Sequence, residues 1–378
     1  MKKRVICAGL LLGMVFGQGV SAQQPTVEVD GTVIETDALI IDDRTYVPLR
    51  GVFEAAGSTV LWDEENWKVS IQTAKTVSDD DLIPEIVEKV SPSVVGIIGR
   101  GKSESYYGSE ESIMGGSGVV IKTGGEILTN AHVVKDMDTI LVVMNDGKGY
   151  EAQLKYIDEE TDLAVVKIKK IGLPVVSFSK KEDIVVGKKV IAIGTPITFS
   201  LRNSTTVGYI SGLNRSVGDP YRLIQTDTTI TNGNSGGALI NMKGELVGIT
   251  SSGYSGSNTN FAIPIDTVQY VIDHFEKYGK VKRPSFGAEF QEDWLAEMGL
   301  PSEAGLSIKG MEKNSPLALA SFKTGDVLVS VAGQSVNSIV ELNELMKSYM
   351  PGDTVRVGVK KDGSIQYAEI VLGEKESK

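Results

Sequence analysis

The sequence predicts a mainly β protein built from several domains, and three observations support this. Residues 83–265 consist mostly of short runs rich in Val, Ile and Thr that Gly, Asn and Asp turns separate. Many short strands with regular turns are typical of a sandwich or a barrel. Residues 285–373 contain further strand-like runs and one helical pattern. The length of 378 residues exceeds one typical domain, so two or three domains are expected.

The N-terminus has the pattern of a secretory leader. "MKKR" is a basic start, "VICAGLLLGMVFG" is an apolar run, and "VSA" ends at Ala22 with the small residues of a cleavage site. The apolar run is shorter than the ~20 residues that a transmembrane helix needs, so an uncleaved membrane anchor is only the alternative. We therefore expect cleavage after Ala22 and a secreted or extracytoplasmic protein, at the cell surface or in the periplasm.

Cysteine usage and charge exclude several classes of function. The single cysteine, Cys7, lies in the leader, so the mature chain has no disulfide, no thiol nucleophile and no thiolate zinc site. Cleavage removes three positive charges and moves the formal charge from −11 to −14. Such an acidic protein is a poor candidate for binding nucleic acid or anionic membranes. No P-loop motif is present, which favours an activity independent of ATP.

A compact α+β unit is expected at residues 26–73. "VEVDGTVI" predicts two strands around an Asp30-Gly31 turn, and "VPLRGVFEAAG" predicts a helix between Pro48 and Gly57. "STVLWDEENWKVSIQT" predicts a hairpin with an acidic turn. The polar, acidic stretch "AKTVSDDDL" that follows is expected to be a linker.

This unit resembles the copper amine oxidase N-terminal-like domain through "RTYVPLRGVFEAAGSTVLWDEENWKVSI". That module occurs on many secreted bacterial proteins. The resemblance implies no copper site here, because the unit has neither histidine nor cysteine. We expect a non-catalytic stalk or cell-surface module that binds a partner at the cell surface.

Turn and helix signals place the next elements. "GGSGVVIKTGGEILTNAHVV" predicts two strands around the turn at Thr123 to Gly125. "IDTVQYVIDHFEKYG" predicts an amphipathic helix that ends at Gly279, and "KVKRP" predicts a basic hinge. The last unit is expected to contain a hairpin that turns at Asp362-Gly363.

One further helix, "SIVELNELMKSYM", opens with the capping box formed by Ser338 and Glu341.

The two histidines of the chain have different surroundings. His274 lies among charged residues of the predicted helix, where a surface or packing role suits it. His132 lies in "LTNAHVV", at the end of a strand-like run where active-site groups are often presented. Asp162 in "EETDLAVVKI" stands where an acidic loop enters an apolar strand, so its carboxylate can be half buried. Taken alone, Asp162 reads as a turn residue.

Ser235 in "TNGNSGG" completes a set of catalytic residue types. The chain order His132, Asp162, Ser235 is that of the chymotrypsin-like barrel fold. A serine hydroxyl is a weak nucleophile until a base such as His132 takes its proton, and Asp162 would orient the imidazole. The glycines would let the N–H groups of Gly233 and Ser235 form an oxyanion hole. The rival explanation of the segment is a plain flexible turn.

Four motifs together resemble the HtrA/Deg serine proteases: "LTNAHVV", "TDLAVVKI", "IQTDTTITNGNSGGALINMKGELVGI" and "NFAIPID". The segment "GLSIKGMEKNSPLALASFKTGDVLVSVAGQSV" looks like a PDZ domain. The resemblance implies a double β-barrel protease followed by a PDZ domain, often assembled as trimers. It also implies protein quality control and stress response, through cleavage of misfolded or unfolded proteins outside the cytoplasm. No metal or other cofactor is implied.

The resemblance also assigns residues that bind substrate. Thr229, six residues before the serine, would lie at the floor of the specificity pocket, and its lack of charge favours a small aliphatic P1 residue. Phe286 and Gly287 of "PSFGAEF" would lie in the PDZ loop that binds C-terminal carboxylates. That loop departs from the usual hydrophobic-Gly-hydrophobic pattern, because Ala288 and Glu289 follow the glycine.

Two other classes of function remain alternatives. A PDZ groove binds extended peptides without chemistry, so a catalytically silent peptide-binding or chaperone-like scaffold is one of them. A small-ester hydrolase uses the same triad, but the G-x-S-x-G elbow is missing. The expected domains are the signal peptide (1–22), the copper amine oxidase N-terminal-like module (23–75), a linker (76–82), the chymotrypsin-like protease domain (83–279) and the PDZ domain (285–373).

Overall fold

The computed structural model describes residues 26–73, 78–105, 108–195, 199–216, 218–253 and 258–375. The chain divides into two compact units, Met1–Ser78 and Asp79–Lys378. The expected signal peptide, with Cys7 and the cleavage position after Ala22, lies outside the described residues. In the part of the chain that is described, no helix has the length and apolar character needed to cross a membrane.

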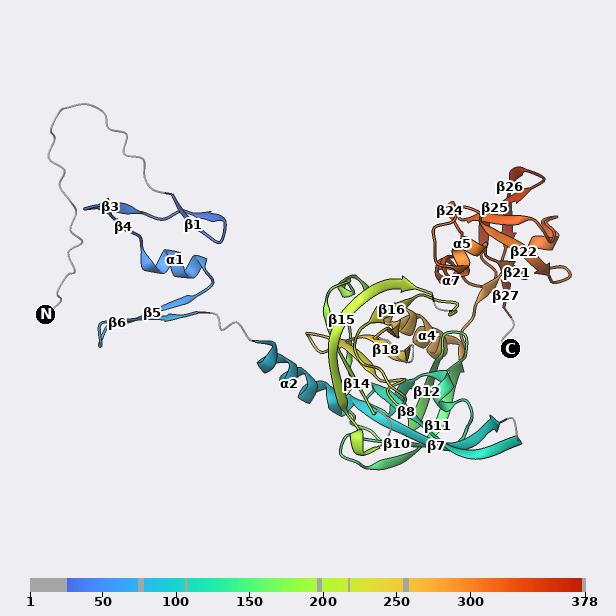
Figure 1. Ribbon diagram of the computed structural model, residues 1–378, viewed down its shortest axis with the longest axis horizontal. Coiled ribbons are helices and arrows are strands. Elements are labelled where there is room, and N and C mark those ends of the chain that lie inside the picture. The colour runs from blue at the N-terminus through green and yellow to red at the C-terminus, as the bar shows by residue number, and fades with distance from the viewer. Residues whose placement is uncertain are drawn as a thin grey trace. The chain divides into compact units, whose positions relative to one another are not determined.

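The N-terminal unit has three hairpins and a short helix over residues 26–73 (Figure 1). Asp30 and Gly31 both have positive φ angles, +49° and +77°, as a two-residue type I′ turn requires. The two strands, the helix and the second hairpin that the sequence predicted for this unit are all present. The elements are β1 (Val27–Val29), β2 (Thr32–Ile34), β3 (Leu39–Ile41), β4 (Arg44–Tyr46), α1 (Leu49–Ala55), β5 (Thr59–Asp63) and β6 (Lys68–Gln72).

Helix α2 (Asp79–Val90) begins inside the stretch that was expected to be a linker, so that expectation is wrong for residues 79–82. Three aspartates occupy the first turn of α2, where negative charge is favourable beside the positive end of the helix dipole. Ile86 and Val90 are buried in the apolar core of the second unit. The polar composition of the stretch therefore reflects a helix start.

The first barrel is closed, with the strand order β10-β11-β12-β9-β8-β7. The expected turn at Thr123 to Gly125 is confirmed between two of its strands. The elements are η1 (Ser91–Ser93), β7 (Val94–Ser105), β8 (Gly108–Lys122), β9 (Glu126–Thr129), α3 (Ala131–Val134), β10 (Met137–Val143), β11 (Gly149–Asp158) and β12 (Leu163–Ile168).

The second barrel has the order β18-β17-β14-β15-β16-β19 and closes through pairing of β18 with β19. A short strand, β13, pairs in parallel with the first two residues of β18, Glu245 and Leu246. The elements are β13 (Ser177–Phe178), η2 (Lys181–Asp183), β14 (Lys189–Gly194), η3 (Phe199–Leu201), β15 (Ser204–Arg215), β16 (Leu223–Thr226), β17 (Ala238–Asn241), β18 (Glu245–Gly253) and β19 (Asn260–Pro264). The double-barrel expectation is confirmed.

Helix α4 (Ile265–Tyr278) follows the second barrel and ends as expected. Gly279 has a φ of +74° and its N–H donates to the Phe275 carbonyl, which caps the helix. Buried side chains of α4 join side chains of both barrels in one apolar cluster, for example Phe275 with Leu128 and Ile191. The two barrels therefore share a core, and the strand ends at their seam are held in fixed relative positions.

The C-terminal part of the second unit has its own core around a mixed strand and helix arrangement. The expected hairpin at Asp362-Gly363 and the capping bond from the Glu341 N–H to the Ser338 hydroxyl (3.1 Å) are both confirmed. The elements are β20 (Pro284–Ser285), β21 (Ala288–Gln291), α5 (Trp294–Glu297), β22 (Leu306–Met311), α6 (Pro316–Leu319), β23 (Val327–Val331), β24 (Gln334–Ser335), α7 (Ile339–Met346), β25 (Thr354–Lys361), β26 (Ser364–Val371) and β27 (Gly373–Glu374).

Candidate active site

His132 and Asp162 meet at one end of the first barrel. His132 lies in α3, just beyond β9, and Asp162 lies in the turn that enters β12, the strand paired with β9. The His132 Nδ1 is 2.7 Å from one carboxylate oxygen of Asp162, and the His132 main-chain N–H donates to the other oxygen over 2.9 Å. Both oxygens are therefore used to orient the imidazole, and Nε2 is left as the nitrogen that can accept a proton.

Asp162 holds an unusual backbone conformation, with a φ of +54°. Aspartate tolerates this left-handed region better than most residues, at a small cost in free energy. The Asp162 carbonyl accepts hydrogen bonds from the Ala131 N–H (3.1 Å) and from the Asn130 side-chain amide (2.9 Å). The strained turn is thus fixed from the same segment that carries His132.

Ser235 lies in the loop between β16 and β17 of the second barrel. Gly233 and Gly236 both have positive φ angles, +97° and +84°. A Cβ atom on Gly236 would lie 2.2 Å from the Ser117 carbonyl oxygen, so only glycine fits there. Gly236 is therefore required by the close approach of the Ser117 main chain, which is a different reason from the oxyanion hole that the sequence suggested for the glycines.

The Ser235 hydroxyl donates to the Ser251 main-chain carbonyl over 2.5 Å. The Ser251 hydroxyl in turn donates to the Asp162 carboxylate over 3.2 Å. Among the hydrogen bonds of the described residues, none joins Ser235 to His132. The structure therefore brings His132 and Asp162 together, and leaves Ser235 beside them with its proton directed to Ser251.

Two main-chain N–H groups of this loop are available as donors. Neither the Gly233 N–H nor the Ser235 N–H donates to another residue that the structure describes. The Asn234 side chain between them is buried (7% exposed) and directed away from solvent. Thr229 is exposed, and its carbonyl accepts from the Thr206 hydroxyl over 3.1 Å.

A second carboxyl group stands close behind the His–Asp pair. Asp219 lines a narrow cavity together with Asp162 and Ser251. Burial raises the pKa of the Asp219 carboxyl, and the negative charge of Asp162 raises it further. Within the described residues, no group of three or more His, Cys, Asp and Glu side chains could hold a metal ion.

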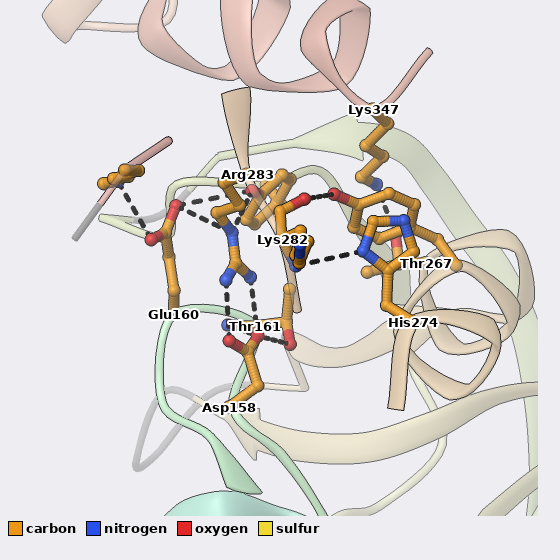
Figure 2. Close-up of polar contacts among 11 residues, drawn as sticks. Asp158, Glu160, Thr161, Thr267, His274, Lys282, Arg283 and Lys347 are labelled. Atoms are coloured by element: carbon orange, nitrogen blue, oxygen red, sulfur yellow. Dashed lines mark hydrogen bonds and ion pairs between the residues drawn. The ribbon is translucent and has the colours of Figure 1, made fainter. Parts of the chain in front are cut away.

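Arg283 anchors the loop that leads to Asp162. Figure 2 shows its guanidinium directed at Asp158, with which it forms two hydrogen bonds of 2.7 and 2.6 Å. Arg283 also lies 3.3 Å from Glu160, and it donates to the Tyr221 hydroxyl over 2.8 Å. The segment "KVKRP" was expected to be a basic hinge, but this arginine is only 9% exposed and ties the linker to the barrel.

His274 has the packing role that was one of its two expected roles. Figure 2 shows its ring beside the Lys282 main chain, whose N–H donates to the His274 Nδ1 over 3.1 Å. Its ring also packs against Tyr270 and Tyr278. The ammonium of Lys347, the residue that follows α7, donates to the Thr267 hydroxyl of α4 over 2.7 Å. The C-terminal end of α7 is therefore tied to α4.

The loop at Phe286 and Gly287, which was expected to bind peptide carboxylates, forms hydrogen bonds with other residues of the protein. Phe286 is 3% exposed and belongs to the core around α7. Gly287 has a φ of +63°; its N–H donates to the Ser285 hydroxyl (2.9 Å) and its carbonyl accepts from the Glu312 N–H (3.0 Å). A peptide carboxylate would have to replace the Ser285 contact to use the Gly287 N–H.

Sequence reasoning missed Ser117, Ser251 and Arg283. Both serines act through hydrogen bonds to segments far away in the sequence, and neither stands in a distinctive motif. A signal for Arg283 existed, because the acidic loop at Asp158 and Glu160 requires a cation if it is to be buried.

The chain matches three protein families. Residues 116–249 match the trypsin-like peptidase domain, residues 284–372 the PDZ domain, and residues 28–79 the copper amine oxidase N-terminal domain. Among solved structures, the HtrA-type protease AlgW with a decapeptide has a TM-score of 0.67 and 27% identity over 78% of this chain and 99% of that one. The serine endoprotease from Yersinia pestis has a TM-score of 0.62 and 31% identity, over 78% and 98%.

Curated relatives agree with these matches. A probable periplasmic serine endoprotease, DegP-like, from Halomonas elongata is 39% identical over 277 residues, which cover 70% of this chain and 58% of the relative. The chain thus spans little more than half the length of that relative. The serine endoprotease DegS of Haemophilus influenzae is 33% identical over 319 residues, covering 80% of this chain and 92% of DegS. The chain therefore belongs to the HtrA/Deg family, whose members named here are serine endoproteases.

Proposed function

We propose that the protein is a secreted, ATP-independent endopeptidase that cleaves misfolded or unfolded proteins with the triad His132, Asp162 and Ser235. The observation that carries this proposal is the double contact of Asp162 with His132, at 2.7 and 2.9 Å. These two contacts orient the imidazole of His132, on the first barrel, for a role as general base. Ser235 is supplied by a loop of the second barrel. The names of the relatives support proteolysis outside the cytoplasm.

In this mechanism the Ser235 Oγ attacks the carbonyl carbon of the scissile bond, and the His132 Nε2 takes the hydroxyl proton. Asp162 stabilises the imidazolium that forms. The N–H groups of Gly233 and Ser235 would donate to the oxyanion of the tetrahedral intermediate. The imidazolium then gives its proton to the leaving amine, and water hydrolyses the acyl-enzyme with His132 again acting as base.

The substrate contacts are proposals as well. Thr229 carries no charge, which favours small aliphatic P1 residues such as Val, Ala or Ile. Phe286 and Gly287 would lie at the end of a PDZ groove that binds C-terminal peptides, after the Ser285 hydroxyl has released the Gly287 N–H. One related structure, the HtrA-type protease AlgW with a decapeptide, supports peptide binding by this kind of protein.

The wider organisation follows the same reasoning. We place the domains at the boundaries expected from the sequence, except that helix α2 begins at Asp79. We propose a signal peptide cleaved after Ala22, assembly as a homotrimer, a role in stress response, and a cell-surface partner for the N-terminal module.

A catalytically silent peptide-binding scaffold is the second candidate. The hydrogen bond from Ser235 to Ser251 favours it, because a hydroxyl held there cannot attack. The two candidates differ in one assay, turnover of a permanently unfolded protein by the full mature chain. The protease should degrade it in the absence of ATP, and Ser235→Ala should bind it without cleaving it. Equal, negligible cleavage by both proteins, with binding retained, would establish the scaffold.

A further inference from the structure

Ser117 lies where the two barrels meet at the nucleophile loop. It is a residue of β8, paired with Gly96 of β7 in the first barrel, and its side chain is fully buried (0% exposed). Its contacts nevertheless reach the second barrel, at Thr195 just beyond β14 and at the loop of Gly233 and Ser235.

The direction of the Ser117 hydroxyl bond is fixed by its partners. The Thr195 main-chain N–H donates to the Ser117 Oγ over 2.8 Å. A serine hydroxyl has one proton, and the Gly233 carbonyl oxygen, 2.7 Å away, can only accept it. The Ser117 main-chain N–H donates to the Ser235 carbonyl over 2.8 Å. Ser117 therefore holds both ends of the segment that would supply the oxyanion donors.

The consequence for Gly233 follows from backbone geometry. The peptide plane between Gly233 and Asn234 is held on both sides, by Ser117 at its carbonyl and by the Thr231 carbonyl, which accepts from the Asn234 N–H over 2.9 Å. The preceding plane carries the Gly233 N–H and is joined to the held plane through the Gly233 φ of +97°. When the peptide plane between Gly233 and Asn234 is fixed, the direction of the Gly233 N–H depends only on the backbone torsions of Gly233.

We propose that Ser117 is a positioning residue for the oxyanion hole: its hydroxyl, by holding the Gly233 carbonyl, aims the Gly233 N–H at the oxyanion. This inference rests on the proposed function, since it assigns the Gly233 N–H a catalytic task. Ser117 itself touches no substrate in this account. Its loss should weaken binding of the tetrahedral intermediate more than binding of the substrate, because the oxyanion exists only during the reaction.

A purely structural role for Ser117 predicts a different result. Removal of its hydroxyl would leave the buried Thr195 N–H and the partly buried Gly233 carbonyl without this partner, and the protein would become less stable. The folded molecules would still turn over substrate at the wild-type rate. Stability and the kinetics of the folded fraction must therefore be measured separately.

The test compares wild type, Ser117→Ala and Ser117→Thr, with Ser93→Ala as control. Ser93 is another buried serine of the protease domain (2% exposed), in η1 and outside the nucleophile loop. For each mature protein we would measure the melting temperature, kcat and KM on a short peptide with Val at P1, and Ki for the matching peptide boronic acid. The boronate forms a tetrahedral adduct on the nucleophile. The same variants in a Ser235→Ala background give the Kd of the peptide itself.

We expect Ser117→Ala to lower kcat by about 10- to 100-fold, somewhat less than the ~10²–10³ lost when an oxyanion donor is removed. KM and the peptide Kd should stay within about twofold, and the boronate Ki should rise by about the same factor as kcat falls. Ser117→Thr keeps the hydroxyl and should restore kcat, while Ser93→Ala should match wild type.

Unchanged kcat in folded Ser117→Ala, or a rise in KM and peptide Kd that accounts for the whole effect, would overturn the inference. If Ser117→Ala does not fold, the nearly isosteric Ser117→Cys provides the same comparison. Its weaker thiol donor should give an intermediate kcat, and wild-type kcat would again overturn the inference. If wild type neither cleaves peptide nor binds the boronate, the proposed function itself fails and the role of Ser117 falls with it.

Discussion

The hydroxyl of Ser235 donates to the main-chain carbonyl of Ser251 over 2.5 Å. In the mechanism that we propose, the Ser235 hydroxyl must turn away from Ser251 before His132 can take its proton. The contact thus describes a resting arrangement of the site, and Ser251 stands at its centre because its hydroxyl also reaches Asp162 over 3.2 Å.

Ser251→Ala should lower kcat by about tenfold, because the Asp162 carboxylate loses a hydrogen bond of the charged type, worth about 1.5 kcal/mol. KM should change little, since Asp162 does not contact the substrate. Steady-state kinetics on a short peptide measures both constants. Ser251→Thr keeps a hydroxyl and should retain most of the activity; a kcat equal to wild type in Ser251→Ala would show that the contact is irrelevant to catalysis.

Arg283→Met should destabilise the second unit by about 3–5 kcal/mol, because it leaves the buried carboxylate of Asp158 without its cation. The Arg283 and Asp158 side chains of this pair are each only 10% exposed. Activity should fall as well, since the loop from Asp158 leads directly to Asp162. Urea unfolding followed by fluorescence gives the free energy, and peptide hydrolysis gives the rate.

The matched control is Lys148→Met. Lys148 forms an exposed ion pair with Asp146, and such pairs contribute about 0–1 kcal/mol. If Arg283→Met costs no more than Lys148→Met, the linker does not support the catalytic loop in the way we describe.

Stability should fall as the pH drops below ~6.5, partly through His274. Burial lowers the pKa of the His274 imidazole, and the nearby Arg283 charge lowers it further. A base with a lower pKa in the folded state binds fewer protons there than in the unfolded chain. Its contribution is therefore complete above the unfolded pKa and is lost as the pH falls through the folded pKa.

Melting temperatures of wild type and His274→Asn between pH 5 and pH 8 test this. The asparagine side chain can still accept from the Lys282 N–H but does not titrate, so the variant should lose less stability on acidification. Parallel pH profiles of the two proteins would exclude His274 as a contributor.

Thr229 should determine the preference at P1. Cleavage sites mapped on an unfolded protein by mass spectrometry should show Val, Ala or Ile at P1. Thr229→Asp should shift the sites toward Arg and Lys, because a carboxylate at the pocket floor attracts a cation. A majority of Arg or Lys sites with wild type would contradict the pocket assignment.

Local patterns in the sequence predicted most of the elements correctly. The Asp30-Gly31 turn and the helix stop at Gly279 each depend on neighbouring residues only, and each is confirmed. The capping box at Ser338 is confirmed in part: the Ser338 hydroxyl caps the helix, but the Glu341 carboxylate accepts from the Asn337 N–H. The start of α2 at Asp79 was missed because its acidic first turn has the composition of a linker.

The residue types of the candidate site could be predicted from the sequence, but many of the hydrogen bonds that connect them could not. The order of His132, Asp162 and Ser235 pointed to one site, and the structure brings the first two into contact. Ser117 and Ser251 could not be found in the same way. Each of the two serines lies in a strand of one barrel and forms a hydrogen bond with a loop or turn of the other, and no local spacing encodes which segments will meet.

The most direct test of the account is labelling of the mature protein with a peptidyl phosphonate, since only a serine activated by a base reacts quickly with it. Peptide mapping should find one adduct, on Ser235, that is lost in Ser235→Ala and strongly reduced in His132→Ala. Asp162→Asn should also weaken labelling, because it disturbs the tautomer of His132. An unlabelled Ser235, in a folded protein that still binds unfolded chains and with unfolded protein and C-terminal peptide present, would contradict the catalytic assignment.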